Sequence, residues 1–114
     1  MPKVSIILYI LPSVLVAGCG NSEPSQATKE ASYIALNQDL IKGRLKDPSS
    51  AEFRNAFVSS AIGAPVVCGE VNAKNSFGGY TGFQRFVSGG SIQVVETDMA
   101  VGEMDKTWSQ VCGR

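Results

Sequence analysis

The sequence contains no histidine, and this absence removes several familiar kinds of chemistry. Without an imidazole there is no Ser-His-Asp or Cys-His catalysis, and no side chain whose ordinary pKa lies near neutral pH. The ten basic and ten acidic residues also leave no excess of either charge. Because duplex nucleic acid is bound through an excess of Lys and Arg on its phosphates, we expect no nucleic-acid partner.

The chain also lacks length and long apolar runs. Its 114 residues suffice for one small domain, and 44% of them are hydrophobic, which is too many for a disordered chain. The longest apolar segment covers residues 4–17. A helix that crosses a bilayer needs roughly 20 residues, so this segment is more typical of a signal peptide than of a permanent anchor.

The end of this segment adds a second signal. Lys3 supplies a positive start, and residues 15–19 read LVAGC, which resembles the lipobox of bacterial lipoproteins. The resemblance implies a diacylglycerol on the sulfur of Cys19, cleavage before it and acylation of the new amino group. The residue after Cys19 is Gly20 and not an aspartate. This resembles the lipoproteins of enteric-type bacteria that are sorted to the outer membrane. We therefore predict a signal peptide (1–18), a lipidated tether (19–26) and a small α+β domain (27–114), held on the periplasmic face of the outer membrane. An ordinary secreted protein or an uncleaved anchor is the alternative.

Three cysteines are present, and a lipid on Cys19 leaves Cys68 and Cys112. An exported chain in an oxidising compartment is expected to pair them as a disulfide. Two buried free thiols are the alternative. A metal site is not expected because the sequence offers no other soft ligand, and no cofactor is expected either.

Hydrophobic periodicity predicts one long amphipathic helix from about Ala27 to Leu45 or Lys46. Asp47 and Pro48 then favour a single helical turn with Asp47 as its N-cap. The apolar stripe expected to face the core comprises Ala27, Ala31, Tyr33, Ile34, Leu36, Leu40, Ile41 and Leu45. Polar residues such as Asn37 are expected on the other side.

The rest of the chain predicts short strands at residues 55–60, 66–72, 80–88 and 92–97, with a hairpin turn at Gly89-Gly90. A tight turn would place Phe83, Val87, Ile92 and Val94 on the core face, and Tyr80 and Phe86 on the opposite face, although a slip of one residue would exchange them. Residues 102–111 predict a short helix that turns Trp108 and Cys112 inward, with an irregular tail as the alternative. The expected fold is α+β: one amphipathic helix packed on a three- or four-stranded antiparallel sheet, with a C-terminal helix or tail stapled by the disulfide.

Two blocks of the domain carry a further resemblance. They read KDPSSAEFRN (46–55) and VCGEVNAKNSFGGYTGFQRF (67–86). Both resemble a group of small, largely uncharacterised bacterial lipoproteins, some of them associated with phage or prophage. The resemblance implies a shared fold and carries no activity, so it assigns no catalytic residue.

The second block contains the candidate binding surface: Asn72, Lys74, Asn75, Phe77 and Tyr80. Amides beside aromatic rings suit a sugar or peptide ligand, and the neighbouring glycines allow close backbone approach. The alternative is structural, with glycines and asparagines forming a hairpin and the rings covering a thin core.

For acid-base chemistry the sequence offers Glu70, Glu96, Asp98, Glu103 and Asp105, and nothing in their spacing pairs two of them across a cleft. We therefore expect a non-enzymatic binding module in the cell envelope, held to the membrane by lipid, whose partner is an envelope protein or peptidoglycan. A phage-related inhibitor or exclusion lipoprotein is one alternative. A periplasmic enzyme that uses carboxylates is the other.

Overall fold

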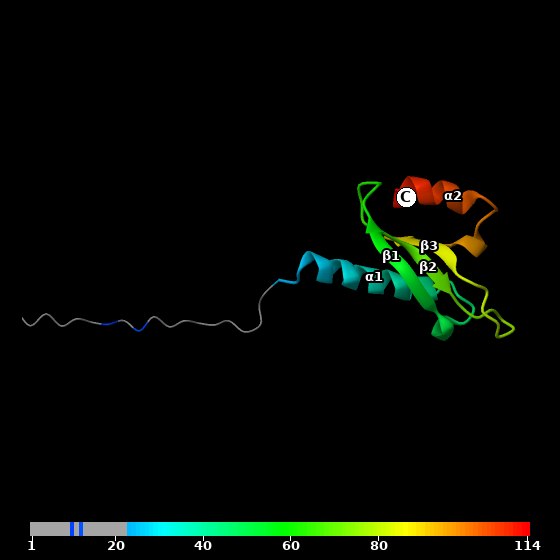
Figure 1. The fold of residues 1–114 in the computed structure, drawn as a ribbon, viewed down its shortest axis with the longest axis horizontal. Coiled ribbons are helices and arrows are strands. Elements are labelled where there is room, and N and C mark those ends of the chain that lie inside the picture. Colours follow the sequence, from blue (N-terminus) through cyan, green and yellow to red (C-terminus); the bar gives the residue numbers. More distant parts are fainter. Residues whose placement is uncertain (1–9, 11, 13–22) are drawn as a thin grey trace, which may run out of the picture.

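The computed structural model describes Ile10, Pro12 and residues 23–114 (Figure 1). Cys19 and the rest of the predicted lipobox lie outside these residues. The helices are α1 (Gln26–Lys42) and α2 (Glu103–Thr107), and the strands are β1 (Glu52–Ser59), β2 (Val66–Asn72), β3 (Gln84–Gly89) and β4 (Ile92–Val95). The strands form one antiparallel sheet in the order β1-β2-β3-β4, which confirms the predicted α+β class. Within the described part of the chain, no helix combines the length and apolar character needed to cross a membrane.

Helix α1 begins where Ser25 accepts a hydrogen bond from the backbone N–H of Thr28 at 3.2 Å. It ends at Lys42, earlier than predicted, because Gly43 follows and the next amides bond three residues back, as Arg44 N–H does to the Ile41 carbonyl. The predicted apolar stripe was wrong in part. Ala27, Ala31, Leu36 and Leu40 are exposed, whereas Asn37, predicted to be outside, is buried.

Strand β1 begins at Glu52 rather than at Asn55, and a β-bulge explains the error. The pairing of β1 with β2 shifts between Arg54 and Phe57, and Asn55 has a positive φ of 55°. A bulge breaks the two-residue alternation that predicts a strand from sequence. The predicted helical turn before β1 is present as a 3-10 turn at Pro48–Ser50, with Asp47 at its N-cap position as predicted, but the Asp47 side chain makes no capping hydrogen bond. Its carboxylate instead accepts a hydrogen bond from the Ser49 hydroxyl at 2.7 Å.

The β3–β4 hairpin is shorter than predicted at its open end, because β3 begins at Gln84 and β4 ends at Val95, but β3 runs one residue further into the turn. Gly89 pairs with Ile92, so the two-residue turn is Gly90-Ser91 rather than Gly89-Gly90. Tyr80 lies outside β3 and forms only an isolated bridge with Lys74. Beyond Val95 the chain leaves the sheet in a 3-10 turn, Glu96–Asp98.

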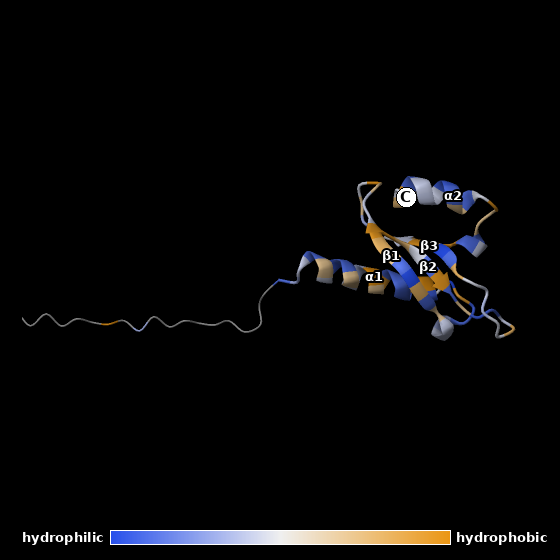
Figure 2. Cartoon of the chain, in the orientation of Figure 1, coloured by the Kyte–Doolittle hydropathy of each residue, from blue (hydrophilic) through white to orange (hydrophobic). Residues whose placement is uncertain are grey.

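Both faces of the sheet are covered, and this overturns the predicted division into a core face and an outer face. Helix α1 covers one face, where Ile41 packs with Val67, Val71, Phe86 and Val95. The C-terminal helices cover the other, where Met104 and Cys112 pack with Val66, Cys68 and Val87. Val87 is buried as predicted, but Phe86 is equally buried under α1. Ile92 is exposed. Figure 2 shows hydrophobic residues along the strands between these two layers.

The C-terminal segment is helical, as predicted. Helix α2 continues into a π-helix, η3 (Trp108–Cys112), which buries Cys112 and packs Trp108 edge-to-face on Phe57 with the ring centroids 6.0 Å apart. The predicted disulfide between Cys68 and Cys112 is present and joins η3 to β2. It closes a loop with a sequence separation of 44 residues. For a loop of this length the chain-entropy model gives about 4 kcal/mol of stabilisation.

Candidate functional site

The candidate binding surface lies on the connection between β2 and β3, which we call the β2–β3 loop (residues 73–83). This loop reaches out from one end of the sheet (Figure 1). Asn75 closes its tip. The Asn75 side-chain oxygen Oδ1 accepts hydrogen bonds from the backbone N–H groups of Phe77 at 2.9 Å and Gly79 at 3.2 Å, and the Asn75 N–H donates to the Gly79 carbonyl at 2.8 Å. These bonds fix the backbone of the turn before any partner binds.

Phe77 projects from this fixed turn, and 97% of its surface is exposed. It therefore covers no core, which contradicts the structural alternative for this residue. Gly78, with φ of +82°, supplies the left-handed backbone that the turn requires next to it. The Phe77 side chain therefore makes almost no contact within the part of the chain that the structure describes.

Tyr80 and Lys74 form the base of the loop. Tyr80 is 47% exposed, and its hydroxyl donates a hydrogen bond to the Ser50 carbonyl at 3.3 Å. Lys74 is held by its backbone N–H, which donates to Ser50 Oγ at 2.8 Å. The Lys74 ammonium lies 5.6 Å from the centroid of the Tyr80 ring. Both side chains are thus anchored at one end and open to solvent at the other.

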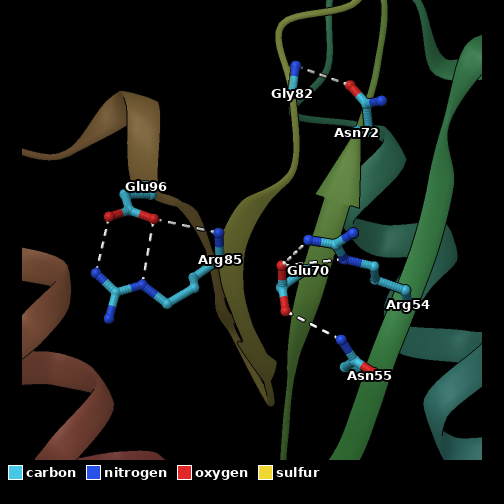
Figure 3. Close-up of polar contacts among 7 residues, drawn as sticks. All are labelled: Arg54, Asn55, Glu70, Asn72, Gly82, Arg85 and Glu96. Carbon is cyan, nitrogen blue, oxygen red and sulfur yellow. Dashed lines mark hydrogen bonds and ion pairs between the residues drawn. The ribbon is translucent and has the colours of Figure 1, made fainter.

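Asn72 has a different position from the other four residues. It is the last residue of β2, and its Oδ1 accepts a hydrogen bond from the Gly82 N–H at 3.0 Å (Figure 3). This bond ties the returning arm of the loop to the sheet. Asn72 and Asn75 therefore both support the loop, and Phe77 and Tyr80 are its exposed aromatic side chains.

A cleft of about 240 Å³ adjoins the base of the loop. Lys74, Asn75 and Thr81 form its loop side, and the turn after α1 contributes Arg44 and Lys46. We call this the basic cleft. Its apolar lining comprises Leu45, Val71, Ala73 and Val95. Arg44 and Lys46 could not be predicted as cleft residues from the sequence, because both fall within the last turn of the predicted helix.

The carboxylates that could serve an enzyme are distributed differently. The register places Arg54, Glu70 and Arg85 side by side on β1, β2 and β3, and Glu96 follows beside Arg85 (Figure 3). Arg54 Nη2 lies 2.9 Å from Glu70 Oε2, and Arg85 Nη2 lies 2.8 Å from Glu96 Oε1. The result is a row of alternating charges across the sheet.

These pairs control the protonation of both glutamates. Hydrogen bonds from Arg54 and then from Asn55 hold the pKa of Glu70 below its usual value, against a smaller opposing effect of burial. Hydrogen bonds from Arg85 lower the pKa of Glu96 in the same way. Both carboxylates are therefore held ionised at neutral pH.

Of the other three acidic candidates, Asp105 lines a cleft of about 480 Å³ together with Glu96 and Arg85, whereas Asp98 and Glu103 do not. Asp105 accepts a hydrogen bond from Arg85 at 2.6 Å and belongs to the same network. Asp98 lines the basic cleft, and Glu103 is exposed in the first turn of α2. Across the described residues, no group of three or more His, Cys, Asp and Glu side chains is arranged to hold a metal ion.

Comparison of the chain with protein families, curated proteins and solved structures gives no match. The candidate site therefore stands on its geometry alone.

Proposed function

We propose that this protein is a lipid-anchored lipoprotein of the bacterial cell envelope, whose domain is a non-enzymatic binding module that contacts an envelope partner through the β2–β3 loop. The observation that carries the binding role is Phe77, which is 97% exposed on a turn whose backbone Asn75 already fixes. Ordering the loop in advance reduces the entropy lost on binding. Phenylalanine is also among the residue types that are enriched at protein interfaces relative to the rest of the surface.

The state of the carboxylates supports a binding role over an enzymatic one. A general acid at neutral pH needs a raised pKa, whereas the pKa values of Glu70 and Glu96 are lowered by their arginine partners. Both carboxylates also have their oxygens occupied by Arg54, Asn55 and Arg85. Such groups suit a structural network better than proton transfer.

The anchor rests on the LVAGC segment at residues 15–19 and on the apolar segment before it. Two or three acyl chains bind a membrane far more stably than one, so the processed protein would remain with the membrane fraction. Metabolic labelling with a radioactive fatty acid should mark the wild-type protein and leave Cys19→Ser unlabelled and unprocessed or soluble. Equal labelling and membrane retention of the Cys19→Ser variant would refute the anchor.

The binding role can be tested by capture from envelope extracts and by retention on purified peptidoglycan. Phe77→Ser should lose the captured material, and Val101→Ser is the matched control because Val101 is also fully exposed but lies before α2. One enriched protein identifies a protein partner, whereas retention on peptidoglycan identifies the wall. Capture that is unchanged in Phe77→Ser would contradict a contact through the β2–β3 loop.

A further inference from the structure

Three basic residues line the basic cleft, and they come from two separate parts of the chain. Arg44 and Lys46 come from the turn after α1, and Lys74 comes from the β2–β3 loop. None of the three lies within 4.0 Å of an acidic group among the residues that the structure describes, whereas Lys42, Arg54 and Arg85 all have ion-pair partners there. Asp98 is the one acidic side chain in the lining. The lining therefore has an excess of positive charge.

The backbone on both sides of the basic cleft is held by hydrogen bonds, which fixes where the three basic side chains begin. Leu45 packs against the core beside Ile41 while its two neighbours, Arg44 and Lys46, are exposed. The Leu45 N–H donates to the Lys42 carbonyl at 3.1 Å, which holds the turn. On the opposite side, the bond from the Lys74 N–H to Ser50 Oγ holds the loop at 2.8 Å.

The remaining lining matches a peptide. Leu45 is half-buried and offers aliphatic contact for a short side chain, whereas Val71, Ala73 and Val95 are buried and form the apolar floor. Asn75 uses its Oδ1 within the loop, while its Nδ2 donates no hydrogen bond to any other residue that the structure describes. This amide is an available donor for a carbonyl or carboxylate oxygen.

The size of the basic cleft limits how much of a ligand it holds. Its volume of about 240 Å³ is below the roughly 300–1,000 Å³ of sites that enclose whole drug-sized ligands. It can therefore take the end of a chain rather than a complete large molecule. We propose that the basic cleft binds the carboxylate end of a short peptide, with Arg44, Lys46 and Lys74 around the carboxylate and the aliphatic lining around the last side chain. This inference rests on the proposed function, because the basic cleft shares Lys74 and Asn75 with the binding surface.

A matched pair of probes tests this assignment. N-acetyl-trialanine carries a free carboxylate, and N-acetyl-trialanine amide differs only in lacking it. Each is titrated into the isotope-labelled, lipidated protein in neutral detergent micelles, and backbone amide signals are followed by NMR. The acid should shift the signals of Lys74, Thr81 and Thr97, with a Kd on the order of 1 mM, as is expected for so small a contact. The amide should bind at least about fivefold more weakly because it makes no charge-assisted hydrogen bond.

Two charge variants provide the control. Lys74→Gln should weaken binding of the acid by about three- to tenfold, since a charge-assisted hydrogen bond is lost at a partly exposed site. Lys106→Gln removes the same charge from α2, outside the basic cleft, and should leave binding unchanged. Equal binding of acid and amide, or equal losses in the two variants, would overturn the proposal.

Two further outcomes would also overturn it. Inorganic phosphate that produces the same shifts at the same concentration would show a general anion site rather than a peptide site. Lower thermal stability of Arg44→Gln together with unchanged peptide binding would show that Arg44 serves only the C-terminal end of α1. The capture experiment with Phe77→Ser does not involve these cations. A failed titration with successful capture would therefore refute the cleft assignment alone, and a failed capture would refute the loop contact.

Discussion

Ser88 on β3 donates a hydrogen bond from Oγ to the side-chain oxygen Oδ1 of Asn37 on α1 at 2.7 Å, and both residues are buried between the helix and the sheet. Asn37 also donates from Nδ2 to the Tyr33 carbonyl one helical turn earlier, at 2.9 Å. The pair joins α1 to β3 in the middle of an otherwise apolar interface with Ile41 and Phe86. It favours the observed rotation of the helix on the sheet, because a rotation that separated the two side chains would leave the buried Ser88 hydroxyl without its partner.

Replacing one member of this pair should lower the free energy of unfolding more than replacing both. Ser88→Ala leaves the buried Asn37 oxygen without a donor and should lower the free energy of unfolding by about 1–3 kcal/mol. The double variant Asn37→Leu, Ser88→Ala replaces both groups by apolar ones and should recover much of that loss. Urea denaturation of the wild type, both single variants and the double variant forms the test. If the loss of stability in the double variant equals the sum of the losses in the two single variants, the two side chains are not coupled.

The disulfide should be the largest single contribution to stability. The double variant Cys68→Ala, Cys112→Ala should unfold about 2–4 kcal/mol more easily, because it releases η3 from β2 and frees a long loop in the unfolded chain. Mass spectrometry of the non-reduced protein should show Cys68 linked to Cys112. Free thiols at both positions in protein recovered from the envelope would contradict this pairing.

Glycines in the β2–β3 loop should differ sharply in their tolerance of alanine. Gly78 has φ of +82°, so Gly78→Ala should destabilise the protein by about 1 kcal/mol. Gly79 has an ordinary φ, and a Cβ there would meet nothing closer than the Asn75 amide at 3.9 Å. Gly79→Ala should therefore be nearly neutral. Thermal melts of the two variants provide the measurement, and equal melting temperatures would contradict this backbone assignment.

Stability should decrease at acid pH through the two arginine-paired glutamates. Their pKa values are lowered in the folded protein, so the unfolded chain binds protons first as the pH falls below the usual glutamate value of 4.5. The stabilisation is present above that pH and is lost as the pH falls through the folded-state pKa values. The double variant Glu70→Gln, Glu96→Gln should be less stable at neutral pH and should lose less stability on acidification. Parallel acid profiles of the variant and the wild type would count against these ion pairs.

The fold class, the long helix, the C-terminal helix and the disulfide could all be predicted from the sequence. Hydrophobic periodicity and cysteine placement are local signals. The predictions that were wrong concern features that depend on tertiary contacts. The sequence predicts Asn37 at the surface because its partner Ser88 is far away in the chain. It predicts Phe86 on the outer face because nothing in the sequence shows that helices cover both faces of the sheet. The bulge at Asn55 likewise breaks the alternation on which the predicted start of β1 depended.

The residues of the candidate site could be predicted from the sequence, but the structural role of each one could not. Amides, aromatics and glycines close together indicate a loop with binding potential. Only the structure separates Asn72, which supports the loop, from Phe77, which is exposed on it. Arg44 and Lys46 could not be assigned to the same site from sequence, because the end of α1 meets the β2–β3 loop only in the folded chain.

Photo-crosslinking from position 77 tests the proposed binding role most directly. A photoreactive phenylalanine analogue replaces Phe77 in the full chain, which is expressed with its own N-terminal segment in bacterial cells and irradiated there. The same analogue at Val101 is the control. The proposal predicts a discrete adduct in the membrane fraction from position 77, with an envelope protein or a peptidoglycan fragment, and no such adduct from position 101. Absence of an adduct from position 77, or the same adducts from both positions, would contradict a partner contact through the β2–β3 loop.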